Sequence, residues 1–88
     1  MQLTNRVAIV TGAARGIGAA TAALLAENGA HVAVSDIDAD VAEAVVQQIT
    51  AAGGSAANFP CDVSKPDQVE GLVTQVVATW GKLDILVN

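Results

Sequence analysis

The chain has 88 residues, of which 52% are hydrophobic and 15% are charged, and its formal net charge is −5. This length allows at most one small domain, over residues 1–88 and without an internal boundary, and an apolar content this high excludes a disordered tail. An aromatic content of 2% and the lack of a basic stripe exclude a nucleic-acid-binding surface.

Short β-branched runs alternate with longer segments of helical period. Arg6–Val10 is apolar and is followed by Thr-Gly, which predicts a buried strand. A helix is expected from Gly16 to Asn28, and His31–Ser35 predicts a second strand. The packed face of this helix is predicted to contain Ile17, Thr21, Leu24 and Leu25.

The second half of the chain repeats this alternation. A helix capped by Asp38 or Asp40 should end at Gly53-Gly54, and a weaker strand should cover Ser55–Phe59. Ser64 is the expected cap of a third helix, and Leu83–Val87 predicts a fourth strand. The packed face of the third helix is predicted to contain Val69, Val73, Val76 and Trp80.

The predicted order is therefore β-α-β-α-β-α-β. Such alternation favours an α/β fold with a parallel sheet between two layers of helices, a Rossmann-type three-layer α/β/α arrangement with strand order 3-2-1-4. In that order Leu83–Val87 is an edge strand, although it is apolar on both faces and has no protective Pro or inward Lys. Such a strand suits an interior position in a sheet, next to a further strand. We therefore expect residues 1–88 to be the N-terminal part of a longer protein.

The segment Thr11–Gly18, TGAARGIG, joins the first strand to the first helix and contains three glycines. Gly12 permits a sharp turn, Gly16 lets a pyrophosphate approach the backbone, and Gly18 permits close packing of helix on sheet. The helix N-terminus offers N–H groups and a partial positive charge to phosphates. The pattern predicts a dinucleotide site, and an ordinary glycine-rich turn is the alternative.

With Thr11 in front, this glycine spacing resembles the cofactor motif of the short-chain dehydrogenase/reductase family. Asp36-Ile37, Asp62–Ser64 and the segment GKLDILVN at Gly81–Asn88 also stand where that family has its signatures. The resemblance covers essentially the whole chain. It implies the NAD-binding part of an oxidoreductase that transfers hydride between a nicotinamide and an alcohol or carbonyl, as in 3-oxoacyl reductases and sugar or polyol dehydrogenases.

Asp36 bears on which cofactor is bound. A carboxylate at the end of the second strand can accept hydrogen bonds from both ribose hydroxyls and repels a 2′-phosphate, which favours NAD over NADP. Arg15 points the other way, because NADP-dependent members of the family often have a basic residue just before the second glycine. We expect NAD, because Asp36 would face the phosphate directly.

The resemblance supplies roles for the remaining site residues. It implies that the Asp62 carboxylate and the Val63 N–H contact the adenine edge, that Ile37 packs on an adenine face, and that Asn88 supports the nicotinamide end. For Asp62, a turn residue ahead of Ser64 is the alternative. The predicted cofactor-binding residues are Gly12, Arg15, Gly16, Ile17, Gly18, Asp36, Ile37, Asp62, Val63 and Asn88.

No catalytic residue is predicted within the 88 residues of the chain. The resemblance implies a Tyr, a Lys four residues later and a Ser, all beyond the fourth strand, and the chain contains no Tyr. A non-catalytic nucleotide-binding module and an inactive fragment therefore remain as alternatives. The resemblance also implies a small-molecule substrate and a homo-oligomer for the full-length protein.

The remaining candidates for chemistry are weak. His31 has no partner constellation and is expected on the surface, whereas Cys61 is expected to be a small buried hydrophobic residue. Thr11 is expected to hold backbone rather than to contact a ligand. A single cysteine, no membrane-spanning run, no signal-peptide pattern and no metal-ligand spacing predict a cytoplasmic protein without a metal.

Overall fold

The computed structural model describes residues 2–88 and contains strands and helices in the predicted alternating order. The elements are β1 (Val7–Thr11), α1 (Gly16–Glu27), β2 (His31–Ser35), α2 (Ala39–Ala51), β3 (Ser55–Asn58), α3 (Pro66–Trp80) and β4 (Ile85–Val87). The bounds of β1, β3 and β4 differ from the predicted ones by one or two residues.

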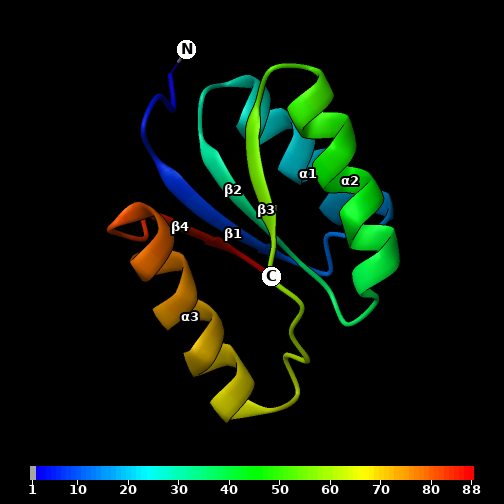
Figure 1. The fold of residues 1–88 in the computed structure, drawn as a ribbon, viewed down its shortest axis with the longest axis vertical. Coiled ribbons are helices and arrows are strands. Elements are labelled where there is room, and N and C mark those ends of the chain that lie inside the picture. Colours follow the sequence, from blue (N-terminus) through cyan, green and yellow to red (C-terminus); the bar gives the residue numbers. More distant parts are fainter. Residues whose placement is uncertain (1) are drawn as a thin grey trace.

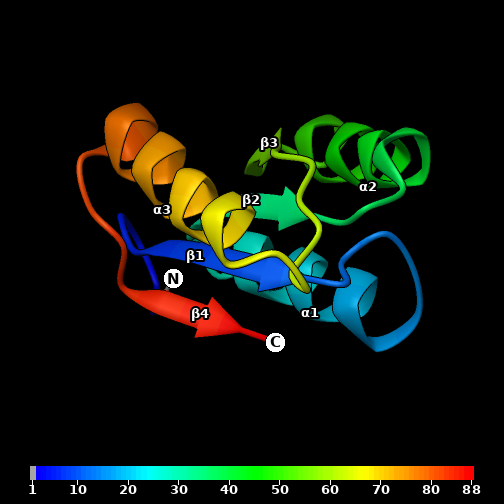
Figure 2. The same ribbon diagram turned by 90° about the horizontal axis from the view of Figure 1, so that it is seen from below.

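The strands form one parallel sheet in the order β3-β2-β1-β4, which confirms the predicted topology. β1 pairs with β2 along its whole length, and Ala8–Val10 of β1 pair with β4. Helices α1 and α2 cover one face of the sheet and α3 covers the other (Figures 1 and 2). This is the predicted three-layer Rossmann-type α/β/α arrangement.

Both faces of the central strands β1 and β2 are buried, and the strand residues alternate between them. Val10 and Val34 pack with residues of α1 and α2, whereas Ile9 and Ala33 pack with Leu72 and other residues of α3. Successive side chains of a strand point to opposite faces. Because helices cover both faces, the central strands β1 and β2 are almost continuously apolar.

Helix α1 packs on the sheet through alanines, so the packed face predicted from sequence was largely wrong. Ala22 and Ala26 are buried, whereas Ile17 is 87% exposed and Leu24 is 59% exposed. Of the predicted apolar residues, Leu25 packs against the core. Small residues let the helix approach the sheet closely, which leaves no room for longer side chains on that side of α1.

The caps of α2 and α3 also differ in part from the predictions. Asp38 is the N-cap of α2 and its Oδ1 accepts from the Val41 N–H at 3.4 Å, which selects Asp38 over Asp40. Lys65, not Ser64, is the N-cap of α3, and it makes no capping hydrogen bond through its side chain. Pro66 at the start of α3 has no N–H, which reduces the need for such a cap.

His31 is partly buried, so its predicted surface position was wrong. Its ring stacks on Trp80 with ring centroids 5.7 Å apart, and its Nδ1 lies 2.7 Å from the Ser55 Oγ. Phe59 meets Trp80 edge-on at 6.0 Å. Cys61 is buried beneath α3, as predicted for a small hydrophobic residue.

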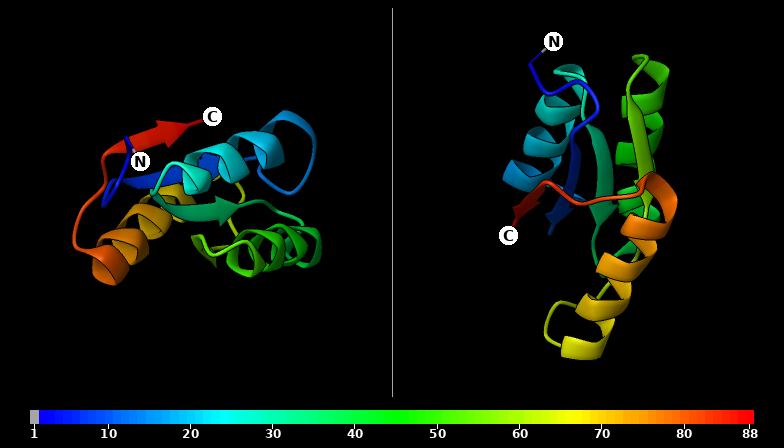
Figure 3. Two further views of the ribbon diagram at one scale, coloured as in Figure 1. Left: turned by 90° about the horizontal axis from the view of Figure 1, so that it is seen from above. Right: turned by 90° about the vertical axis from the view of Figure 1, so that its left-hand side faces the viewer.

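The β4 strand forms an edge of the sheet (Figure 3). Its Leu86 is 53% exposed. Just before β4, the Asp84 carboxylate accepts a hydrogen bond from the Val7 N–H at 2.9 Å and pairs with Lys82 at 3.2 Å and Arg6 at 3.6 Å. Among residues 2–88, no helix combines the length and the apolar character needed to cross a membrane.

Candidate functional site

The segments that follow the strands meet at the carboxyl edge of the sheet (Figure 1). This edge contains the glycine turn (the segment Thr11–Gly18) after β1, Asp36 and Ile37 after β2, the segment 61–65 after β3, and Asn88 after β4. In open parallel sheets, ligands bind at this edge where the strand order reverses, which here lies at β1. The structure therefore brings all the predicted cofactor-binding residues to one edge.

The glycine turn has an open outer face and a closely packed inner one. Gly12 and Gly16 both have φ of +62°, a left-handed conformation that glycine adopts without strain. A Cβ added at either residue would have no atom within 4 Å, whereas a Cβ on Gly18 would collide with the Gly12 carbonyl. A ligand can thus approach the backbone at Gly12 and Gly16, while Gly18 sets the close packing of α1.

The first turn of α1 is not capped by a side chain. Arg15 is the N-cap residue and makes no side-chain capping hydrogen bond, and the first turn contains no acidic residue. Two preceding amides are used to hold the turn against β2, since Ala13 N–H donates to the Ser35 carbonyl at 3.1 Å and Ala14 N–H donates to Asp36. The helix end therefore presents N–H groups and a partial positive charge, which suits an anion.

The Asp36 carboxylate lies between the glycine turn and the start of α2. Its Oδ2 accepts from the Ala14 N–H at 3.1 Å, and its Oδ1 accepts from the Asp38 N–H at 2.9 Å. These bonds hold the carboxylate in one place. A carboxylate has about four acceptor positions, so two bonds to the protein leave capacity for the hydroxyl groups of a ligand.

Arg15 and Asp38 form an ion pair beside Asp36. The Arg15 Nη2 lies 2.6 Å from the Asp38 Oδ2, and the two side chains are 69% and 43% exposed. Sequence reasoning considered the two residues separately, Arg15 as a phosphate ligand and Asp38 as a cap, and missed the pair. No spacing rule connects them, because they follow different strands and meet only at the carboxyl edge.

The Asp62 carboxylate is used in a local turn. Its Oδ1 accepts from the Ser64 Oγ–H at 2.7 Å and from the Ser64 N–H at 3.0 Å. These hydrogen bonds, the side-chain one first, hold the pKa of Asp62 below its ordinary value, so the group is ionised at neutral pH. This is the turn that sequence analysis gave as the alternative role, and it leaves the second carboxylate oxygen for a ligand.

Three large apolar side chains are exposed at this edge. Ile17 is joined there by Ile37, which is 72% exposed, and by Val63, which is 56% exposed. Exposed apolar side chains that gather around polar groups are typical of ligand sites. Each of them offers apolar surface at this edge on which a flat aromatic ring could pack.

Thr11 positions the end of β4 next to β1. Its Oγ1 lies 3.2 Å from both the Val87 carbonyl oxygen and the Asn88 Oδ1. The prediction that Thr11 holds backbone is confirmed by the contact with Val87. As a result, Asn88 lies beside the first residues of the glycine turn.

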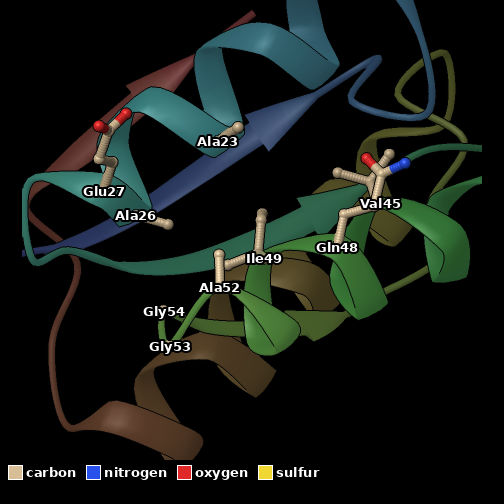
Figure 4. Close-up of a pocket in the computed structure, with 9 residues that line it drawn as sticks. All are labelled: Ala23, Ala26, Glu27, Val45, Gln48, Ile49, Ala52, Gly53 and Gly54. Carbon is tan, nitrogen blue, oxygen red and sulfur yellow. The ribbon is translucent and has the colours of Figure 1, made fainter.

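A pocket of about 410 Å³ lies at the opposite end of the molecule, between the carboxyl ends of α1 and α2 (Figure 4). It is lined by Ala23, Ala26, Glu27, Val45, Gln48, Ile49, Ala52, Gly53 and Gly54. Helices run back from the carboxyl edge, so this pocket lies away from the glycine turn. Within the described part of the chain, no group of three or more His, Cys, Asp and Glu residues could hold a metal ion.

The parallel sheet, the glycine turn and the acidic residue after β2 define a Rossmann-type nucleotide-binding fold. The chain belongs to the short chain dehydrogenase family, whose model matches residues 6–88. The resemblance predicted from sequence is thereby confirmed.

Individual relatives agree with this assignment. Tropinone reductase-like 2 from Erythroxylum coca is 49% identical over 87 residues, which are 99% of this chain and 30% of that protein. A metagenomic short-chain oxidoreductase in complex with NADP superposes with a TM-score of 0.93 at 43% identity, over 98% of this chain and 39% of that one. A 7α-hydroxysteroid dehydrogenase complexed with NADH superposes with a TM-score of 0.96 at 42% identity, over 99% of this chain and 34% of that one. The chain thus spans about a third of the length of these relatives.

Proposed function

We propose that the carboxyl edge of the sheet binds a nicotinamide dinucleotide and prefers NAD to NADP. The observation that carries this proposal is the Asp36 carboxylate, held by the Ala14 and Asp38 amides directly beside the glycine turn. A fixed negative charge at this position accepts ribose hydroxyls and disfavours a 2′-phosphate. Solved relatives contain NADH in one case and NADP in another, so the preference rests on Asp36 itself.

The residues at the edge fit the parts of such a cofactor. The open glycine turn and the uncapped start of α1 suit the pyrophosphate, and Asp36 suits the adenosine ribose. The exposed apolar side chains suit the adenine ring, and Asn88 beside the turn suits the nicotinamide end. When bound, the cofactor supplies a hydride donor or acceptor. The proposed contacts come from Gly12, Arg15, Gly16, Ile17, Gly18, Asp36, Ile37, Asp62, Val63 and Asn88.

We further propose that the protein containing this chain is an oxidoreductase acting on an alcohol or carbonyl compound. The relatives include a D-threitol dehydrogenase and a cyclohexanol dehydrogenase, which fit this chemical class. The chain itself contains no Tyr to serve as the proton donor that the family resemblance implies. Its own contribution to the reaction is to bind and orient the cofactor.

The test is to titrate NAD and NADP separately into the full natural chain and into Asp36→Asn. We expect the wild type to bind NAD more tightly. Hydrogen bonds to a charged group contribute about 1.5–3 kcal/mol each, so the variant should lose roughly ten- to a hundredfold in NAD affinity. Its NADP affinity should fall much less or rise, because a repulsive charge is removed.

Glu27→Gln is the matched control, because it removes a carboxylate charge at the opposite end of α1. It should leave both affinities unchanged. Wild-type chain that prefers NADP would contradict the cofactor preference. Wild-type chain that binds neither nucleotide would contradict the binding function as a whole.

A further inference from the structure

We infer that Asp38 is a second determinant of cofactor choice: it holds Arg15 in an ion pair and so withholds the guanidinium from a 2′-phosphate. The inference rests on the proposed function, since it concerns the same nucleotide site. It assigns a role to the pair that neither residue has alone. Arg15 by itself would favour NADP, and Asp38 by itself is a helix cap.

The contacts place the pair directly at the Asp36 carboxylate. The Asp38 N–H donates to the Asp36 Oδ1, and the Asp38 side chain contacts the Arg15 guanidinium at 2.6 Å. On the other side, Ala14, the neighbour of Arg15 in the chain, donates to the Asp36 Oδ2. Asp38 therefore links the two other charged residues: its N–H binds Asp36, the residue proposed to face the ribose, and its carboxylate binds Arg15.

The balance of charge among these three residues decides which group is accepted. Arg15 contributes one positive charge, and Asp36 and Asp38 contribute one negative charge each, which leaves the cluster negative. A phosphate monoester carries a charge of about −1.5 to −2 at neutral pH. It would meet net repulsion, and the nearest guanidinium already donates to a carboxylate. The uncharged ribose hydroxyl of NAD has no such cost.

Stabilisation of the fold does not account for the ion pair. The Arg15 side chain is 69% exposed and the Asp38 side chain 43% exposed, and ion pairs that water reaches in this way contribute little to stability. The cap that Asp38 provides uses its Oδ1, whereas the contact with Arg15 uses its Oδ2. The two roles are therefore separable, because asparagine also caps helices but has no charge.

The experiment measures the affinities for NAD and NADP of the full natural chain with Asp38→Asn, Arg15→Gln and both changes. Asp38→Asn should raise the NADP affinity about tenfold, since the loss of the Asp38 negative charge also frees the Arg15 guanidinium to bind the 2′-phosphate. Its NAD affinity should stay within about twofold. In the Arg15→Gln background, the same change at Asp38 should raise the NADP affinity by only about two- to threefold, because only the repulsion is then removed.

Asp40→Asn is the matched control, since Asp40 is exposed in the first turn of α2 and is two residues from Asp38. It should leave the ratio of the two affinities unchanged. Asp38→Ser, which also retains a capping oxygen, should reproduce the effect of Asp38→Asn. Thermal unfolding of each variant tests whether the fold is retained.

If the wild-type chain binds NAD, the proposed function stands, and two results would still overturn the inference. One is an equal change in the NAD and NADP affinities of Asp38→Asn. The other is a tenfold gain that persists without Arg15. If the wild-type chain binds neither nucleotide, the proposed function fails and this inference fails with it.

Discussion

Gly18 determines how closely the first turn of α1 lies against the glycine turn that follows β1. A Cβ there would meet backbone atoms of Gly12 and Ala13, which cannot move aside as a flexible side chain can. Its role in packing, predicted from the motif, is visible in the alanines that continue the same contact along the helix. One small residue thus positions the first turn of α1 and, through it, the open backbone of the glycine turn.

Gly18→Ala should therefore destabilise the protein by about 1–3 kcal/mol, the range for overpacking a close contact. Chemical denaturation monitored by circular dichroism measures this change. Gly71→Ala is the matched control, because Gly71 lies inside α3 and an added Cβ would have no atom within 4 Å. That substitution should stabilise by up to about 1 kcal/mol, because alanine favours a helix. Equal effects at the two positions would contradict the packing role.

At the level of elements, β4 is held in the sheet by the residues just before it. The strand β4 has only three residues, and they pair with Ala8–Val10 of β1. The hydrogen bond from Val7 N–H, with further contributions from Lys82 and Arg6, holds the pKa of Asp84 below its ordinary value of 3.8, against the opposing effect of burial. A carboxylate with a lowered pKa in the folded state stabilises that state while it is ionised.

The sign of the pH dependence follows. The contribution of Asp84 is complete above its ordinary pKa of 3.8 and is lost as the pH falls through the lower, folded-state pKa. We expect Asp84→Asn to be less stable than wild type at neutral pH and to lose less stability on acidification, as measured by denaturant unfolding at a series of pH values. Glu70→Gln, which removes the charge of an exposed residue of α3, should show the wild-type pH slope. Identical slopes for wild type and Asp84→Asn would contradict the assignment.

At the level of the whole molecule, large apolar side chains remain exposed on β4 and on α1. Leu86 of β4 is 53% exposed, and Leu24 of α1 is 59% exposed. The edge strand also presents backbone groups that can pair with another strand. The chain spans about a third of the length of its relatives, and open surfaces of this kind favour association when the 88 residues are produced alone.

Self-association of the 88-residue chain should therefore depend on β4. Leu86→Lys should shift the mass measured by light scattering after size-exclusion chromatography towards the monomer mass of 8.8 kDa, because a charge on an edge strand opposes pairing. Val77→Lys is the matched control, because Val77 is 40% exposed on α3, away from the strand edge. An equal shift in both variants would indicate a general effect of charge rather than pairing at β4.

Several features of the site and the packing could not have been predicted from the sequence. The alanine face of α1 was missed because apolar spacing favoured the larger side chains Ile17 and Leu24, which point away from the sheet. His31 was placed on the surface because its stacking partner, Trp80, lies far along the chain. A prediction from apolar spacing favours the largest apolar side chains. Where a helix lies close to a sheet, however, only small side chains fit between the two backbones.

The sequence by itself determined the order of elements, the parallel sheet and the glycine turn. Each of these depends on local properties: strand and helix periodicity, and backbone angles that only glycine adopts easily. Only the tertiary structure decided that Asp36 binds the Ala14 amide and that Arg15 pairs with Asp38. Those contacts join segments that follow different strands, and they exist because a parallel sheet brings all its carboxyl ends to one edge.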